Sequence, residues 1–508
     1  MRKVKLRYLD WGLSMLVGIA VFLFWYVAYP HAMSYQEQYQ LFLWTGDYFL
    51  ERLCLPGGLA DWLGEFVEQF YYLEWLGALL LALLFVTLQR LTEQLLPQNQ
   101  GDRPMILDRI TRPVPLILSL LPVALVLWLM GDINVLLSLP VAVVLALALA
   151  CMRMKKTLSW TDALILPVAY WLIGPAICIY VIIRVIQLGW KHLWTVGWLL
   201  AVQLMVYAWL LPQWPLQQVM AGLNYYRIPL HYPQLNGYDK EMYELIRMDY
   251  LVRHERWDDI VKRAGEYQVR TPFWSNCVNL ALSQKRLLAD RMFDFWQSGE
   301  DALIMPRTRD LTSMLPTAEA FWRLGMVNSA LRYMFDTQES ILNGRKSGRC
   351  TKRIAECMIV NGHYKTARKQ INLLKKSLFY RGWAEEAEAM MKDEAAINAH
   401  LVYGKLRQLR YKENFLYSYE EIDKMFGLLF MNNTENKMAL DYFLGQLLLK
   451  GDIKGFQQYL GLAQQYGGYR QMPLGYQDVM RCIQMHGNVQ GSPFADYAKR
   501  MIEGRAGR

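Results

Sequence analysis

Long apolar runs separated by short polar segments occupy residues 1–212, and a finer helical alternation of apolar and polar positions follows them. About 20 apolar residues in an α-helix cross the roughly 30 Å hydrocarbon core of a bilayer. We therefore predict an all-α chain whose N-terminal bundle holds five or six transmembrane helices. The runs are Trp11–Tyr29, Tyr72–Leu88, Pro113–Met130, Val135–Cys151, Thr157–Ile186 and Trp194–Leu211.

Charges between these runs orient the bundle. Basic residues open the chain as MRKVKLR and recur after the second and fourth runs, whereas residues 30–74 carry seven acids and one base, Arg52. Because cytoplasmic loops are enriched in Lys and Arg, the N-terminus is predicted to be cytoplasmic. Residues 30–74 are predicted to form an outer amphipathic loop of two interfacial helices, broken at Pro56-Gly57-Gly58.

The fifth run contains helix breakers at Gly174 and Pro175, and its path decides the side of the C-terminal half. A full crossing would return the last helix inward and make the tail cytoplasmic. A broken or re-entrant hairpin would place the tail outside, because non-helical backbone is tolerated where protein buries it. Basic residues precede Trp194 and few charges follow Leu211, which favours the outside. Both paths remain open from the sequence.

Residues 213–238 form a proline-containing linker, and residues 239–508 show an all-helical pattern of paired segments. Gly325 stands five residues before Ala330, and Gly362 stands five residues before Ala367 after an interval of 37 residues. Glycine permits a tight turn after a first helix, and alanine lets a second helix approach it closely. This spacing predicts a tetratricopeptide-like (TPR-like) array of helical hairpins. An ordinary helical bundle is the alternative.

Composition narrows the class of partner. The chain has 508 residues, a net charge of +10 and 20% charged residues, and residues 213–508 carry 41 Lys/Arg against 32 Asp/Glu. Both signs are interspersed without a basic stripe, which argues against nucleic acid. The expected partners are membrane lipid and a protein bound through residues 239–508. Seven cysteines show neither paired nor zinc-like spacing, so no disulfide framework, metal or cofactor is predicted.

Three acids of the outer loop are the one candidate for catalysis. Glu37, Asp47 and Glu51 follow the first predicted span, and Asp47 lies one helical turn from Glu51. A carboxylate there could act as general base or hold a metal for a glycosyltransferase acting on lipid-linked sugar. An interfacial helix also needs a polar face, which explains the same acids without chemistry. No Walker loop, dinucleotide fingerprint, H-E-x-x-H or G-x-S-x-G occurs.

Three stretches of the chain resemble a family of Bacteroidota membrane proteins that has no assigned activity. They are Gln36–Phe66, Asn279–Phe295 and Tyr364–Glu386. The resemblance implies several spans followed by a TPR-like tail in a Gram-negative inner membrane, and it transfers no catalytic residue. The chain departs from the family pattern at Arg286, where a glycine is usual.

The sequence thus predicts a bacterial inner-membrane protein that presents a helical-repeat tail for protein binding, as a scaffold in a cell-envelope assembly. The glycosyltransferase-like enzyme is the alternative. Transport has little support, because Asp162 and Arg184 are the few charges near the apolar segments and both lie at segment edges.

Overall fold

All regular elements in the described part of the chain are helices, which confirms the all-α prediction. The helices group into two compact units. The first unit comprises Met1–Lys240 with Lys376–Phe379, and the second comprises Glu241–Lys375 with Tyr380–Arg508. The computed structural model describes residues 2–96, 113–154, 160–210, 213–227, 237–306, 314–341, 345–411, 419–467, 469–487 and 489–506.

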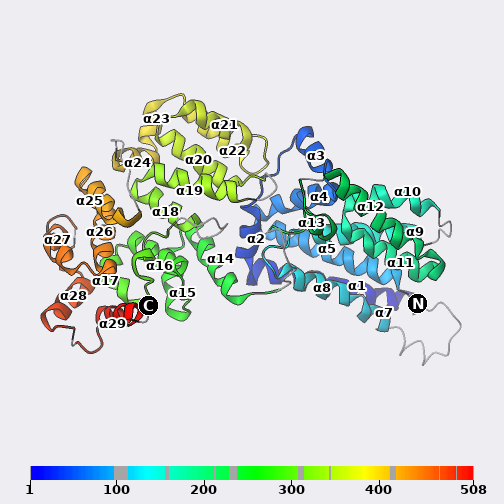
Figure 1. The fold of residues 1–508 in the computed structure, drawn as a ribbon, viewed down its shortest axis with the longest axis horizontal. Coiled ribbons are helices and arrows are strands. Elements are labelled where there is room, and N and C mark those ends of the chain that lie inside the picture. The colour runs from blue at the N-terminus through cyan, green and yellow to red at the C-terminus, as the bar shows by residue number, and fades with distance from the viewer. Residues whose placement is uncertain are drawn as a thin grey trace. The chain divides into compact units, whose positions relative to one another are not determined.

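The first unit is a set of apolar helices with shorter helices at their ends (Figure 1). Its elements are α1 (Arg2–Leu23), η1 (Phe24–Ala28), α2 (Pro30–Glu37), α3 (Gly46–Leu53), α4 (Gly58–Glu68), η2 (Gln69–Tyr72), α5 (Glu74–Leu95), α7 (Pro113–Leu118), α8 (Leu120–Met130), α9 (Ser138–Arg153), α10 (Thr161–Ile173), η3 (Pro175–Ile177), α11 (Cys178–Leu188), η4 (Trp190–His192), α12 (Trp194–Leu210) and α13 (Leu216–Ala221).

Three helical segments of this unit are long and apolar enough to cross a membrane: Trp11–Ala28, Glu74–Leu95 and Trp190–Leu210. Four further apolar helices are shorter than a full span, namely Val114–Met130, Ser138–Arg153, Thr161–Ile173 and Pro175–Leu188. Membrane-compatible helices are therefore present in the first unit. The count of five or six crossing helices stays a prediction.

The fifth apolar run is two short helices with a break between them. Gly174 ends α10 with φ +89°, a backbone conformation that glycine adopts readily, and Pro175 then starts η3. Proline has no N–H to donate, so it cannot continue the hydrogen-bond ladder of α10. The chain breaks at the two residues singled out from the sequence.

The residues predicted as a linker are partly folded into the first unit. Among residues 213–238, those described contain α13 and then run beside the loop after α8: Leu136 N–H donates to Tyr225 O (2.9 Å) and Arg227 N–H donates to Asn134 O (2.7 Å). Val219 packs in a small apolar core with Leu210. This segment is anchored to the helices that precede it.

The second unit is a succession of helices, many of them joined as antiparallel pairs (Figure 1). Its elements are α14 (Lys240–Arg253), α15 (Trp257–Glu266), α16 (Pro272–Gln284), α17 (Leu288–Arg291), η5 (Met292–Asp294), η6 (Gly299–Ala302), α18 (Met314–Leu324), α19 (Val327–Ser340), α20 (Gly348–Val360), α21 (Tyr364–Leu374), α22 (Arg381–Met390), α23 (Glu394–Ala399), α24 (Tyr403–Leu409), η8 (Tyr419–Glu421), α25 (Ile422–Asn432), α26 (Lys437–Lys450), α27 (Ile453–Tyr466), α28 (Leu474–Gln484) and α29 (Pro493–Ala506).

One turn geometry recurs at six helix ends of this unit. A left-handed residue follows the helix, and the next N–H donates to the carbonyl five residues back, over 2.8–2.9 Å, which satisfies an otherwise unpaired helix carbonyl. Glycine is the usual left-handed residue because it has no Cβ to clash. Three of the six positions are nevertheless not glycine, so a search of the sequence for glycine finds only some of these turns. The left-handed residues are Glu255, Arg286, Gly325, Gly362, Gly451 and His486.

The fifth residue after most of these turns is fully buried. Ala330 and Ala367, the two small residues singled out from the sequence, have no exposed surface. Ile260 and Phe456 occupy the equivalent position after Glu255 and Gly451 and are also fully buried. The contact thus recurs with larger apolar side chains, because neighbouring helices adjust their separation to the residue that fills the gap.

The two glycines predicted from the sequence are not equivalent, which gives a matched test. A Cβ at Gly325 (φ +85°) would lie 2.9 Å from Leu409 Cβ, whereas a Cβ at Gly362 (φ +78°) would meet nothing within 4 Å. Gly362→Ala should cost about 1 kcal/mol through backbone strain, and Gly325→Ala should cost clearly more because the clash is added. Thermal unfolding of the full chain in mild detergent measures both. Equal shifts would contradict the Leu409 contact.

Candidate functional site

The three acids predicted as catalytic lie in different environments. Glu37 is the last residue of α2 and is buried, whereas Asp47 and Glu51 are exposed on α3. Glu51 Oε1 lies 3.3 Å from Arg52 Nη1, with 64% of the Glu51 side chain exposed. No described contact gathers the three carboxylates at one point, as a general base or metal site would need. Within the described residues no group of three or more His, Cys, Asp or Glu is placed to hold a metal ion.

A buried charge cluster lies beside these acids, between α3 and α4. Arg52 Nε donates to Glu65 Oε2 (2.8 Å) and lies 3.8 Å from Asp61 Oδ2, and both carboxylate residues are 1% exposed. Burial raises the pKa of Tyr48, whose hydroxyl donates to Glu65. Burial alone would lower the pKa of Arg52, but the Glu65 carboxylate raises it above its ordinary value. The sequence signal was Arg52 itself, the single base among seven acids.

Helix α4 turns its polar residues inward. Asp61, Glu65 and Glu68 are buried, while Trp62 and Phe66 on the other faces are only partly covered. Gly64 lets α4 approach α9 closely, since a Cβ there would lie 2.7 Å from Ser138 N. The predicted interfacial helix therefore directs its acids into protein, while its aromatic residues are half-buried and pack on one another and on Phe42.

A second buried ionic cluster joins four segments of the first unit around Asp162. Arg153 Nη2 (3.0 Å) and the Tyr180 hydroxyl (2.7 Å) donate to Asp162 Oδ1. Arg184 Nε donates to Oδ2 (3.2 Å), and His192 Nε2 lies 3.0 Å from the same oxygen. Asp162, Arg184 and His192 are at most 2% exposed. Sequence reasoning placed Asp162 and Arg184 at separate segment edges and missed this pairing.

Charged and aromatic side chains also interlock in the second unit. Glu319 on α18 accepts from Arg323 Nε and from Arg353 Nη2 of α20, each at 2.8 Å. Arg353 lies over the Trp322 ring (4.4 Å) and Arg323 over the Trp257 ring (4.9 Å). Burial would raise the pKa of Glu319, but Arg353 and Arg323 outweigh it and lower that pKa. The arginines are satisfied internally, so this network ties helices together and offers no open anion site.

A largely irregular stretch of the chain, residues 296–305 with the single turn η6, is mostly buried inside the second unit. Side-chain amides and hydroxyls from several helices donate to its backbone carbonyls, which removes the cost of burying them. The space between these helices is therefore filled by the chain itself. The donors are Asn276 and Asn279 on α16, Tyr333 on α19, Tyr419 on η8 and Gln446 on α26.

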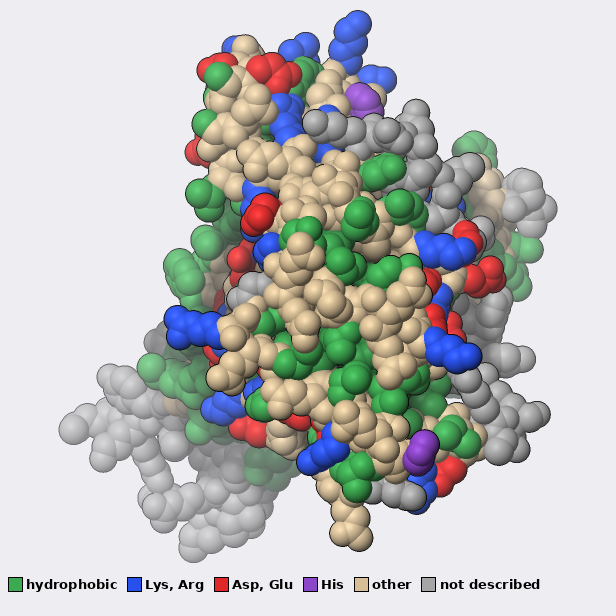
Figure 2. Space-filling view, turned by 90° about the vertical axis from the view of Figure 1, so that its left-hand side faces the viewer, with side chains coloured by type: hydrophobic (Ala, Val, Ile, Leu, Met, Phe, Trp, Pro, Cys, Tyr) green, Lys and Arg blue, Asp and Glu red, His purple; other side chains and the backbone are tan. Residues whose placement is uncertain are grey.

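Several large apolar residues of the second unit are exposed on α25, α27 and α28. Leu428 and Met431 on α25, Tyr459 on α27 and Leu474 on α28 are exposed, with Leu474 at 70%. Figure 2 shows hydrophobic side chains gathered among polar ones on the side of the unit that carries these helices. Large exposed apolar residues cost solvation free energy and mark candidate binding surfaces.

Arg286 anchors a buried carboxylate from its left-handed turn. Its Nη1 donates to Asp441 Oδ2 (3.0 Å) and its Nη2 to Gly467 O (2.6 Å), and Tyr469 donates to Asp441 as well. Arg286 is 39% exposed whereas Asp441 is 1% exposed, so water weakens the ion pair. Burial consequently outweighs Arg286 and raises the pKa of Asp441 to about 6.

This raised pKa predicts a pH-dependent stability for the second unit. The folded chain holds the Asp441 proton more tightly than the unfolded chain, so the stabilisation is complete below about pH 4 and is lost as pH rises through about 6. The free energy of unfolding is expected to be about 3 kcal/mol lower at pH 7.5 than at pH 4 on account of this group. Asp441→Asn should flatten the pH profile of the unfolding temperature, while Asp258→Asn, at an 86% exposed side chain, should not. An unchanged profile in Asp441→Asn would argue against the raised pKa.

By its fold the chain is an all-helical protein in which a unit of membrane-compatible apolar helices is followed by a unit of helical hairpins. Residues 6–501 match a family described as a family of unknown function, DUF6057, and the chain belongs to that family. No curated protein and no solved structure matches the chain.

Proposed function

We propose that this chain is a multi-pass protein of a bacterial inner membrane that presents a TPR-like domain, residues 239–508, for binding a protein partner in a cell-envelope assembly. The N-terminus is cytoplasmic in this proposal. The first unit is the membrane domain with five or six crossing helices, and its function is to anchor and position the tail.

The carrying observation is that the first unit has an apolar exterior and a charged interior. Asp162 and Arg184 are 0% and 1% exposed, whereas large apolar side chains along its helices are open. Water-soluble domains show the opposite distribution, because exposed apolar surface is costly and charges prefer water. In a membrane, lipid covers the exposed apolar surface, and pairing within the protein lowers the cost of burying the charges. Examples of exposed side chains are Leu16 (63%), Leu121 (62%), Ile186 (77%) and Trp209 (79%).

Protein binding by the tail is supported by its hairpins and its exposed apolar residues. Recurrent helical hairpins build extended surfaces suited to peptides and partner helices. The space beside α16 and α26 already holds residues 296–305, so a partner must use another surface. The exposed apolar residues of α25 and α28, among them Met431 and Leu474, offer one.

The glycosyltransferase-like alternative keeps Glu37, Asp47 and Glu51 as its candidate residues. No specific observation favours it, since one of these acids is buried and the other two are exposed. Asp47→Asn with Glu51→Gln would remove an envelope-glycan phenotype under the enzyme hypothesis and leave it intact under the scaffold hypothesis.

In-cell photo-cross-linking of the full-length chain tests the proposal. A benzophenone side chain is placed at Met431, Leu474 or Leu401 in the tail, all exposed, and at Ile186 as the lipid-facing control. The tail positions should give discrete protein adducts that mass spectrometry identifies as one partner, and Ile186 should give none of them. The chain must also stay in the membrane pellet after alkaline carbonate extraction. Release from the pellet, or no discrete adduct at any tail position, would overturn the proposal.

A further inference from the structure

Hydrogen bonds within the first unit sort its helix ends into two opposite sets. At one end, Ser14 of α1 donates to Gln89 of α5 (2.6 Å), and Gln89 donates to Ser119 before α8 (2.9 Å). Cys151 near the end of α9 contacts Leu91 O (3.5 Å). The start of the apolar segment Trp11–Ala28, the start of α8 and the ends of α5 and α9 therefore share one end of the unit, here named the Asp162 end.

The Asp162 cluster adds three further helix ends to this set. Asp162 is the second residue of α10, Arg184 lies in the last turns of α11, and His192 lies two residues before α12. Besides their bonds to Asp162, Arg184 Nη1 donates to Arg153 O at the end of α9 (3.1 Å). Trp198 in the second turn of α12 donates to Ala163 O (2.9 Å).

The opposite end holds the break at Gly174 and the segment after α12. Tyr225 OH donates to Ile173 O (2.6 Å) and accepts from Ala176 N–H (3.1 Å). The backbone of the same tyrosine bonds the loop before α9 through Leu136 (2.9 Å). Trp171 donates to Leu53 O of the outer loop (2.8 Å). The last described residues of the unit stay at this end, where the Tyr238 and Tyr29 hydroxyls lie 3.3 Å apart.

From this arrangement we infer that residues 161–188 form a hairpin that enters the membrane and returns to the face it started from, so that the tail leaves on the face opposite the N-terminus. The inference rests on the proposed membrane insertion of the first unit. α1, α5, α8, α9 and α12 each run from one end to the other, which is an odd number of crossings. The α10–α11 hairpin begins near Asp162 and ends near Arg184, at the same end of the unit, so it adds no crossing and the total stays odd.

Charge distribution supports the same arrangement independently of the hydrogen bonds. Of the fourteen Lys and Arg residues before residue 213, thirteen fall before Trp11, in the last turns of α5, α9 and α11, or in the segments that follow these helices at the Asp162 end. Arg52, in the loop at the other end, is the exception. The positive-inside rule therefore makes the Asp162 end cytoplasmic, with Lys191 and His192 on the same side as the N-terminus. The hairpin removes the conflict that a full crossing by this segment would create.

The partner class follows from this topology. The outer-loop helices α3 and α4 and the tail belong to one compartment, outside the cytoplasm. A protein that binds the tail is consequently a periplasmic protein or the periplasmic part of an envelope protein, and cytoplasmic proteins have no access to it.

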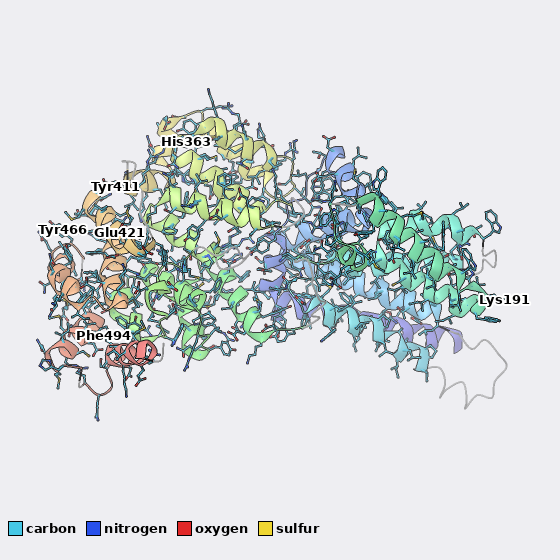
Figure 3. All side chains as sticks on the ribbon, in the orientation of Figure 1. Lys191, His363, Tyr411, Glu421, Tyr466 and Phe494 are labelled. Carbon is cyan, nitrogen blue, oxygen red and sulfur yellow. The ribbon has the colours of Figure 1, made fainter. Side chains whose placement is uncertain are left out.

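Two exposed residues that bracket α12 provide the test. Lys191 points away from the helices at the Asp162 end (Figure 3), and Gln213 is exposed three residues after α12. Each is replaced singly by cysteine in a full-length chain lacking the native cysteines, and spheroplasts are treated with a membrane-impermeant maleimide before and after lysis. Gln213→Cys should be labelled in intact spheroplasts, and labelling of Lys191→Cys should rise severalfold on lysis. Alkaline phosphatase fused after Arg508 of the unaltered chain should be active, and a green fluorescent protein there should be dark.

The outcomes separate the two proposals. Labelling of Lys191→Cys in intact spheroplasts with Gln213→Cys protected, together with a fluorescent C-terminal fusion, would show that the hairpin crosses and would overturn this inference alone. Equal labelling of both positions, or release of the chain by alkaline carbonate, would show that α12 does not span and would overturn the membrane anchoring itself.

Discussion

Asp162→Asn is expected to destabilise the first unit by about 3–5 kcal/mol, because it leaves the buried Arg184 guanidinium without its counter-charge. Arg184 is 1% exposed and His192 is 2% exposed, and Asp162 is the carboxylate that both contact. Asparagine keeps the size of the side chain and can accept a hydrogen bond, so the loss of stability reports the effect of removing the negative charge. The apparent unfolding temperature in mild detergent and the amount of folded protein in membranes measure the effect.

Two further variants show whether charge is the cause. Asp132→Asn changes a half-buried aspartate at the opposite end, whose side chain accepts from Asn134 N–H (2.9 Å), and should cost only about 1 kcal/mol. Combining Asp162→Asn with Arg184→Gln should recover part of the loss, since the uncompensated guanidinium is then gone. An Asp162→Asn chain that unfolds at the wild-type temperature would refute the buried ionic cluster and weaken the proposed hairpin.

Arg52→Met is the second change with a large expected effect, again about 3–5 kcal/mol. Methionine fills the space of the arginine stem but leaves Glu65 and Asp61, each 1% exposed, without the guanidinium. Uncompensated buried carboxylates take up protons, which raises their pKa in the folded variant. A raised carboxyl pKa gives stability that is lost as pH rises, so the deficit relative to the unaltered chain should grow from pH 5 to pH 8.

Matched controls lie on the surface. Arg291→Met removes a guanidinium that is 42% exposed and pairs with Asp294 at 3.0 Å, and it should cost about 0–1 kcal/mol. Glu51→Gln touches the exposed side of Arg52 and should also be mild. A pH-independent deficit in Arg52→Met would show that lost packing dominates over charge.

Helix type and approximate position could be predicted because they depend on local properties. Apolar run length located the three helical segments that are long and apolar enough to cross a membrane, Trp11–Ala28, Glu74–Leu95 and Trp190–Leu210. Glycine at Gly325 and Gly362 marked two turns that the structure places in the left-handed region.

The same turn at Glu255, Arg286 and His486 could not be found from the sequence. Non-glycine residues adopt a left-handed conformation at a cost of about 1–2 kcal/mol, which favourable contacts elsewhere must offset. At Arg286 this cost is offset by hydrogen bonds to Asp441 and Gly467. Asp441 lies 155 residues away in the sequence.

The candidate site was predicted less well than the fold. Acids Asp47 and Glu51 were chosen because they stood together in one loop, yet both are exposed on α3. The buried charges are elsewhere, on residues whose partners are distant in sequence: 22 residues separate Asp162 from Arg184 and 30 separate it from His192. Which charge meets which carboxylate depends on how the helices pack, and spacing along one chain carries no such information.

From its sequence alone this protein is determined to be all-helical, with an apolar first part and a charged second part, because helix formation and hydropathy are properties of short stretches. The tertiary structure alone decided that residues 161–188 turn back at Gly174, that Asp162 gathers Arg153, Arg184 and His192, and that residues 296–305 fill the interior of the second unit. Each of these depends on contacts between segments far apart in the chain, where burial makes an unpaired charge or carbonyl too costly to leave without a partner.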